Sequence, residues 1–120
     1  MAKVLVVDDV AVDLNRMADI VKSMGHVAIP ASDGEEAIAK TLSERPDLIL
    51  LDIVIPKKNG FQVCRELRED PAVASIPIVM VTSKNQDNDK FYGLKQGAND
   101  YIPKPYTEDA LKNVIRKYLK

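Results

Sequence analysis

The chain has 120 residues, and its 17 lysines and arginines nearly balance 18 aspartates and glutamates, for a formal net charge of -1. This length is typical of one domain with one core. A nearly neutral chain lacks the strong basic field that backbone binding to nucleic acids needs, so direct nucleic acid binding is not expected. Its single cysteine cannot form an intrachain disulfide, which fits a reducing, cytoplasmic environment. Apolar runs such as residues 48–51 are too short for a signal peptide or for membrane insertion.

Short apolar runs alternate with longer amphipathic segments along the whole chain. The runs that we predict as strands are residues 4–7, 27–30, 48–51, 78–81 and 100–102. Between them apolar residues recur with the helical period, as in Leu14, Met17, Ala18 and Val21. Strict alternation of strands and helices is typical of parallel strands joined by crossover helices. The sequence therefore predicts an α/β fold with an open, doubly wound sheet.

Polar residues directly follow four of the predicted strands. Because parallel strands with right-handed crossovers bring their carboxyl ends to one edge of the sheet, we expect these residues to share a site. Neighbouring carboxylates disfavour each other's ionised form, so such a cluster favours a cation, and oxygen ligands suit Mg²⁺. The residues at these positions are Asp8, Asp9, Asp52, Thr82, Ser83, Lys104 and Pro105.

Four segments of this edge occur in a distinctive order. They are VVDD at residues 6–9, LDIVIPKKNG at 51–60, VTS at 81–83 and GANDYIPKP at 97–105. Together they resemble the receiver domain of bacterial response regulators, the CheY-like family of two-component signalling, and most of all its stand-alone chemotaxis and twitching-motility regulators. The resemblance covers the whole chain. It implies a (βα)5 three-layer, flavodoxin-like fold with a parallel sheet of order 2-1-3-4-5, as one receiver domain over residues 1–120 without an output domain.

The resemblance also implies the input chemistry of the site. Asp52 matches the phosphoacceptor, which takes a phosphoryl group from a histidine kinase or a histidine phosphotransfer protein. Asp8 and Asp9 match the acidic pair that holds Mg²⁺ together with Asp52 and the backbone carbonyl of Val54. Lys104 matches the lysine that pairs with phosphoryl oxygens.

The resemblance also implies roles for two hydroxyl residues and for a proline near the phosphoacceptor. The Thr82 and Ser83 hydroxyls follow the fourth strand, where they can contact the phosphoryl group. The resemblance implies a cis bond between Lys104 and Pro105, which would aim the lysine inward.

The resemblance implies an output as well. Thr82 matches a switch hydroxyl drawn toward the phosphoryl group, and Tyr101 matches the aromatic residue that then moves inward. The face formed by the fourth helix, fifth strand and fifth helix would change and bind a downstream protein target. We expect the chain to be a monomer, and dimerisation on phosphorylation is left open as the alternative.

Val54 and Lys84 flank the route of the hydrolytic water in the family, and aliphatic Val54 predicts slow loss of the phosphoryl group. The chain would assist its own phosphorylation and dephosphorylation without being an enzyme for an external substrate.

Two other functions use similar chemistry. A flavodoxin-like electron carrier shares the fold, but its phosphate-binding loop is rich in Ser, Thr and Gly, whereas residues 8–11 here are acidic and lack glycine. An aspartyl-phosphate phosphohydrolase needs a second acid two residues after its nucleophile, where this chain has Val54. We therefore expect neither function.

Other polar residues have simpler interpretations. Asp13 falls in the first turn of a predicted helix, where a negative charge complements the helix dipole, so we interpret it as a helix charge and not as a ligand. Cys64 falls on an apolar stripe and is expected to be a buried hydrophobe. His26 follows Gly25 in a turn and is expected to be a structural surface residue.

Overall fold

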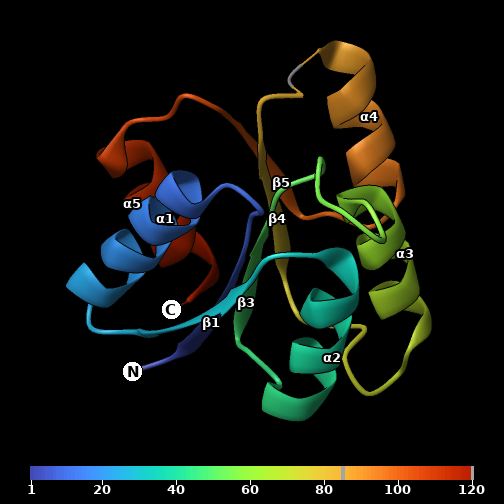
Figure 1. Ribbon diagram of the computed structural model, residues 1–120, viewed down its shortest axis with the longest axis horizontal. Helices are drawn as coiled ribbons and strands as arrows, with labels where there is room; N and C mark the ends of the chain where they lie inside the picture. The colour runs from blue at the N-terminus through green and yellow to red at the C-terminus, as the bar shows by residue number, and fades with distance from the viewer. Residues whose placement is uncertain (85, 120) are drawn as a thin grey trace.

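The computed structural model describes residues 1–84 and 86–119, in which strands and helices alternate strictly (Figure 1). Each strand leads into the helix that follows it in the chain. The strands are β1 (Lys3–Val7), β2 (Val27–Ala31), β3 (Leu48–Leu51), β4 (Ile78–Thr82) and β5 (Asp100–Pro103). The helices are α1 (Ala11–Ser23), α2 (Gly34–Glu44), α3 (Gly60–Glu69), α4 (Asp87–Lys95) and α5 (Glu108–Tyr118). None of the helices in the described ranges is long and apolar enough to cross a membrane.

The strands form a parallel sheet in the order β2-β1-β3-β4-β5, which confirms the predicted doubly wound topology. The direction of winding reverses between β1 and β3, the position at which such sheets carry their functional crevice. Val7 at the end of β1 pairs with Leu51 at the end of β3. Because the next residues are Asp8 and Asp52, this register places the two carboxylates side by side.

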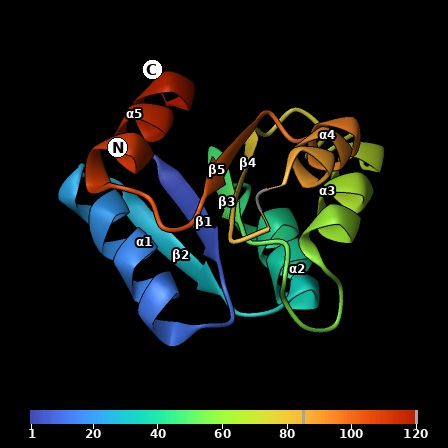
Figure 2. The same ribbon diagram turned by 90° about the horizontal axis from the view of Figure 1, so that it is seen from above.

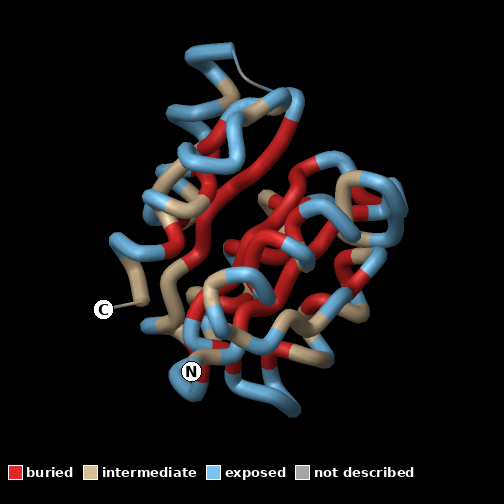
Figure 3. Tube along the Cα trace, turned by 90° about the vertical axis from the view of Figure 1, so that its left-hand side faces the viewer, coloured by how far each residue is buried: buried red, intermediate tan, exposed pale blue. Residues whose placement is uncertain are grey.

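Helices cover both faces of the sheet. Figure 2 shows α1 and α5 on one face and α2, α3 and α4 on the other. Alternate residues of β1 point to opposite faces, so Leu5 packs in the core beneath α2 and α3, while Val4 packs in the core beneath α1 and α5. The strands between the helical layers form the continuous buried interior of the molecule (Figure 3).

Side-chain caps fix where two of the helices around the site begin. Asn59 precedes α3, and its side chain accepts a hydrogen bond from the Gln62 backbone N–H at 3.0 Å, while the Gln62 side chain accepts from the Asn59 N–H. Thr107 precedes α5 and accepts from the Ala110 N–H at 3.1 Å. These caps define the lengths of the loops that run past the carboxyl ends of β3 and β5.

Gly60, the first residue of α3, lies against the backbone that carries Asp52. A β-carbon at Gly60 would lie 2.5 Å from the backbone oxygen of Asp52 and 2.7 Å from the α-carbon of Ile53. Neither backbone atom can move as freely as the end of a side chain. Gly60 thus permits the close approach of α3 to the end of β3.

We expect Gly60→Ala to lower the free energy of unfolding by about 1–3 kcal/mol, because the new β-carbon must displace backbone atoms. Gly93→Ala is the matched control within α4, since a β-carbon there meets only side chains, the nearest being Phe61 Cε1 at 3.4 Å. Replacing a glycine in a helix by alanine gains up to about 1 kcal/mol, so Gly93→Ala should be neutral or stabilising. Urea unfolding measures both variants, and equal losses would contradict the close approach at Gly60.

Candidate functional site

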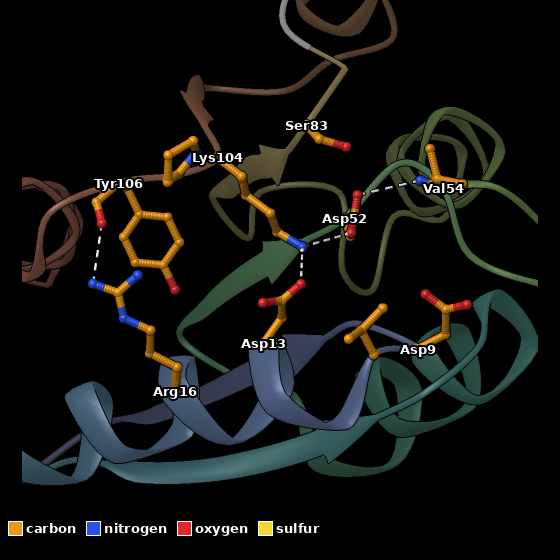
Figure 4. Close-up of a pocket in the computed structure, with 10 residues that line it drawn as sticks. Asp9, Asp13, Arg16, Asp52, Val54, Ser83, Lys104 and Tyr106 are labelled. Atoms are coloured by element: carbon orange, nitrogen blue, oxygen red, sulfur yellow. Dashed lines mark hydrogen bonds and ion pairs between the residues drawn. The ribbon is translucent and has the colours of Figure 1, made fainter.

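A pocket of about 540 Å³ opens at the carboxyl edge of the sheet (Figure 4). It lies over the ends of β1 and β3 and is bounded by α1 on one side and by the loop between β5 and α5 on the other. The residues that line it are Asp9, Val10, Asp13, Arg16, Asp52, Val54, Ser83, Lys104, Pro105 and Tyr106.

Two buried carboxylates lie at the base of this site. Asp8 is fully buried, and its Oδ1 accepts a hydrogen bond from the Val10 backbone N–H at 2.9 Å. Asp52 is 6% exposed, and its Oδ1 accepts from the Val54 N–H at 3.2 Å. Each carboxylate is therefore oriented by the backbone two residues further along the chain, which leaves its second oxygen for other partners.

The second oxygens of both carboxylates bind the ammonium group of Lys104. Lys104 Nζ donates to Asp8 Oδ2 at 2.5 Å and to Asp52 Oδ2 at 2.9 Å, and a third bond goes to Asp13 Oδ2 at 3.1 Å. The Lys104–Pro105 peptide bond is cis. One ammonium thus joins carboxylates from β1, α1 and β3.

Burial and charge act in opposite directions on these groups. Burial raises the pKa of Asp8 above its ordinary value, although the hydrogen bonds from Lys104 and Val10 oppose that shift. Burial alone would lower the pKa of Lys104, but its hydrogen bonds to Asp8 and Asp52 outweigh burial and raise that pKa. Lys104 therefore stays charged throughout the physiological range and is the cation that makes a buried Asp8 carboxylate tolerable.

Asp9 differs from its neighbour because it is exposed and lines the pocket without contacting Lys104 (Figure 4). In residues 1–84 and 86–119, no three His, Cys, Asp or Glu side chains are grouped so as to hold a metal ion. Asp9 and Asp52 nevertheless line one pocket. Mg²⁺ usually takes one or two protein carboxylates and keeps several waters, so the chemistry of this donor pair fits that ion.

Thr82 is the last residue of β4, and Ser83 and Lys84 follow it in the chain. Thr82 is fully buried, and its Oγ1 accepts a hydrogen bond from the Lys84 backbone N–H at 3.3 Å. Ser83 is exposed and lines the pocket. The Lys84 side chain does not line it, because its ammonium pairs with Asp89 Oδ1 of α4 at 3.2 Å. Lys84 thus connects the end of β4 to the first turn of α4.

Tyr101 of β5 has its hydroxyl inside the protein. This oxygen is buried, and it has no hydrogen-bond partner within the described part of the chain. Burial, together with repulsion from Asp89 and Asp52, raises the pKa of Tyr101 to about 12. The family resemblance implies a switch role for Tyr101, which stays a prediction; the structure places its hydroxyl in the interior.

Two residues of α1 were not assigned to the site from the sequence. Asp13 is an acidic residue in the first turn of α1, as predicted, and its carboxylate also binds Lys104, a contact that the sequence did not identify. Arg16 was missed altogether: its Nη2 donates to the Tyr106 carbonyl at 3.0 Å, and its guanidinium carbon lies 4.5 Å from the centroid of the Tyr106 ring. Their spacing of three residues places both on one side of α1, which is the signal that could have identified them.

The two residues assigned structural roles lie elsewhere. Cys64 is buried in α3, as predicted, and burial raises the pKa of its thiol to about 11. His26 Nδ1 accepts a hydrogen bond from the Ala2 backbone N–H at 3.0 Å, at the opposite edge of the sheet. Neither residue contributes to the pocket.

Comparison with known proteins identifies a family for most of the chain. Residues 4–116 match the model of the response regulator receiver domain family. The chain is 39% identical to protein PilH of Pseudomonas aeruginosa over 119 residues, which are 99% of this chain and 98% of PilH. It also matches longer transcriptional regulators and spans about half of their length.

Solved structures of similar proteins share the fold closely. The chemotaxis protein CheY4 of Vibrio cholerae superposes with a TM-score of 0.93 at 30% identity, over 99% of each chain. The receiver domain of the sensor histidine kinase PA1611 of Pseudomonas aeruginosa superposes with a TM-score of 0.90 at 26% identity, over 98% of this chain and 96% of that domain. The PA1611 domain has a magnesium ion coordinated in its active site cleft.

We expect Lys104→Met to lower the free energy of unfolding near neutral pH and to lower it less at acidic pH. Without the ammonium, Asp8 is a buried and less compensated charge, and we expect a loss of about 3–5 kcal/mol near neutral pH. The pKa of Asp8 in the folded state, already raised, would rise further above its unfolded value. The folded variant then binds a proton more tightly than the unfolded chain, so its lost stability returns as the pH falls through the folded pKa.

Urea unfolding of both proteins at about pH 7.5 and about pH 5 measures this difference. Lys117→Met is the control, because the Lys117 side chain is 63% exposed and pairs with Asp100 at the surface. It should cost about 1 kcal/mol or less at both pH values. If the free energy of unfolding of Lys104→Met falls below that of wild type by the same amount at both pH values, this account of the buried charges is contradicted.

Proposed function

Because the chain belongs to the response regulator receiver domain family of two-component signalling, we propose that it is a phosphorylation-activated switch whose phosphoacceptor is Asp52. The observation that carries the proposal is the contact of Lys104 Nζ with Asp52 Oδ2 at 2.9 Å, at the edge of an open pocket. A carboxylate reacts poorly with an anionic phosphoryl group unless positive charge is near. Lys104 would supply that charge.

In the proposed reaction, one carboxylate oxygen of Asp52 attacks the phosphorus of a phosphohistidine. The new P–O bond forms as the P–N bond breaks, and the imidazole of the donor leaves. Lys104 then pairs with an oxygen of the transferred phosphoryl group. The Ser83 hydroxyl, which lines the pocket with Asp52, and the Thr82 hydroxyl at the end of β4 would provide further hydrogen bonds to that group.

We propose Mg²⁺ as the cofactor, held by Asp8, Asp9, Asp52 and the backbone carbonyl of Val54. Support comes from the donor set, since Asp9 and Asp52 line one pocket and offer the hard oxygen ligands that Mg²⁺ prefers. When bound, the ion neutralises negative charge on the phosphoryl group. The chain's own residues provide the nucleophile, the ammonium and the hydroxyl donors.

The output would begin at Thr82, whose hydroxyl is buried close to the end of β3. Movement of that hydroxyl toward a phosphoryl group would break its hydrogen bond from the Lys84 N–H. Tyr101, whose hydroxyl lies inside the protein without a partner in the described residues, would respond and alter the surface formed by α4, β5 and α5. We propose that this surface binds the downstream protein target.

Receiver domains take phosphoryl groups from histidine kinases and act on downstream targets. For this chain we propose a histidine kinase or a histidine phosphotransfer protein as the donor, and a role in chemotaxis or surface motility, supported by its similarity to PilH and CheY4. The flavodoxin-like and phosphohydrolase alternatives have no support, because the comparisons identify a receiver domain. The residue two positions after Asp52 is Val54, which cannot act as the acid that a phosphohydrolase needs.

The phosphoacceptor role is tested by incubating the protein with phosphoramidate and Mg²⁺ and measuring its intact mass. Wild type should gain one phosphoryl group, and chelation of Mg²⁺ with EDTA should prevent the gain. Asp52→Asn should gain none, because an amide is not a nucleophile toward phosphorus. Asp19→Asn, which changes an exposed carboxylate on α1, is the control and should behave like wild type. A phosphoryl group on Asp52→Asn would overturn the assignment.

Val54 is expected to set the lifetime of the phosphoryl group. Val54 is 57% exposed, and its aliphatic side chain cannot hydrogen-bond a water beside Asp52. Val54→Asn should speed phosphoryl loss on the order of tenfold, less than the ~100-fold of a general base, because an amide orients water without taking its proton. The decay of phosphorylated protein after donor removal measures this rate. Val54→Leu, whose side chain has nearly the shape of asparagine but cannot hydrogen-bond water, is the control and should decay like wild type. Unchanged decay in Val54→Asn would contradict the role of Val54.

A further inference from the structure

Lys104 has no free hydrogen-bond donor in this structure. An ammonium group carries three N–H donors, and those of Lys104 go to Asp8, Asp13 and Asp52. A phosphoryl oxygen can therefore bind Lys104 only if one of these carboxylates gives up its hydrogen bond. The structure distinguishes which of the three leaves at least cost.

The three carboxylates differ sharply in exposure. The side chain of Asp8 is 0% exposed and that of Asp52 is 8% exposed, whereas that of Asp13 is 41% exposed. Before a metal ion binds and before Asp52 is phosphorylated, a buried carboxylate that loses its ammonium partner is left as an uncompensated charge, but an exposed one exchanges the ammonium for water. Asp8 is held further by the Val10 N–H. Asp13 is thus the partner that Lys104 can release.

We propose that Asp13 is the exchangeable counter-ion of Lys104: it occupies the third ammonium donor in the unphosphorylated chain and competes there with an oxygen of the phosphoryl group. This inference rests on the phosphoacceptor role proposed above for Asp52. Asp13 also adds negative charge on the pocket wall that an anionic phosphodonor must approach. Both effects slow phosphorylation, so Asp13 limits the response of the switch.

The loop that carries Lys104 is anchored independently of Asp13. The Lys104 backbone N–H donates to the Thr82 carbonyl at 2.9 Å, which fixes the loop to the end of β4. Two residues further on, Arg16 of α1 holds the Tyr106 carbonyl and stacks on the Tyr106 ring. With these anchors in place, loss of the Asp13 contact frees one donor of Lys104 without releasing the backbone of the loop.

The test compares Asp13→Asn with wild type in phosphorylation by phosphoramidate and Mg²⁺, followed by intact mass over time. Asp19→Asn is the matched control, because it removes the same charge from the same helix at an exposed position with no contact to Lys104. We expect Asp13→Asn to be phosphorylated about two- to fivefold faster than wild type, the range set by a partly exposed ion pair. The gain should shrink as salt rises, because salt screens the competing charge.

An increase in rate separates this role from a structural one, since a merely structural contact would slow the reaction when lost. Asp13→Ser provides a second uncharged variant in case Asp13→Asn folds poorly, and circular dichroism checks both. If wild type is phosphorylated and the Asp13 variants react at the wild-type rate or slower, the exchange role is overturned and the function of Asp52 stands. If wild type gains no phosphoryl group on Asp52, the proposed function fails and this inference fails with it.

Discussion

The ion pairs of Lys104 with two buried carboxylates are the constraint on which the rest of the site depends. Lys104 lies 96 residues from Asp8 and 52 residues from Asp52 in the sequence, so its side chain ties the first, third and fifth strands of the sheet together. Burying like charges at neighbouring strand ends is unfavourable without a cation. In the proposed function, the charge that compensates the buried carboxylates is also the charge that an incoming phosphoryl group needs. Stability and reactivity would then depend on the same ammonium group.

The fold and the strand-end residues could be predicted because their signals are local. Alternation of apolar runs with helical stripes identifies the strands and crossover helices, and chain topology then places the carboxyl ends of the strands along one edge. The register of Val7 with Leu51 brings Asp8 and Asp52 together as a consequence. The predicted cation was Mg²⁺, which stays a proposal, and in this structure Lys104 brings positive charge to the two buried carboxylates.

The contacts across elements could not be predicted because they depend on how far a side chain reaches after packing. Asp13 and Arg16 belong to a helix turn whose polar residues have an ordinary surface composition, and only the position of α1 over the loop after β5 gives them partners. Arg68 is another case: it donates to the Gly97, Ala74 and Ile76 carbonyls at the far edge of the sheet. Such contacts join segments that are far apart in the sequence, and no local sequence pattern indicates that they meet.

A short series of contacts connects the charged site to α4. The Thr82 carbonyl holds the Lys104 backbone, the Thr82 hydroxyl holds the Lys84 N–H, and the Lys84 ammonium pairs with Asp89 on α4. Beside this series, the Tyr101 hydroxyl is buried and lacks a partner in residues 1–84 and 86–119, a state that costs about 1–3 kcal/mol. In the proposed switch, a rearrangement that gives this hydroxyl a partner, or returns it to water, would recover that energy. A shift at Thr82 would then favour a second position of Tyr101 over the position seen here.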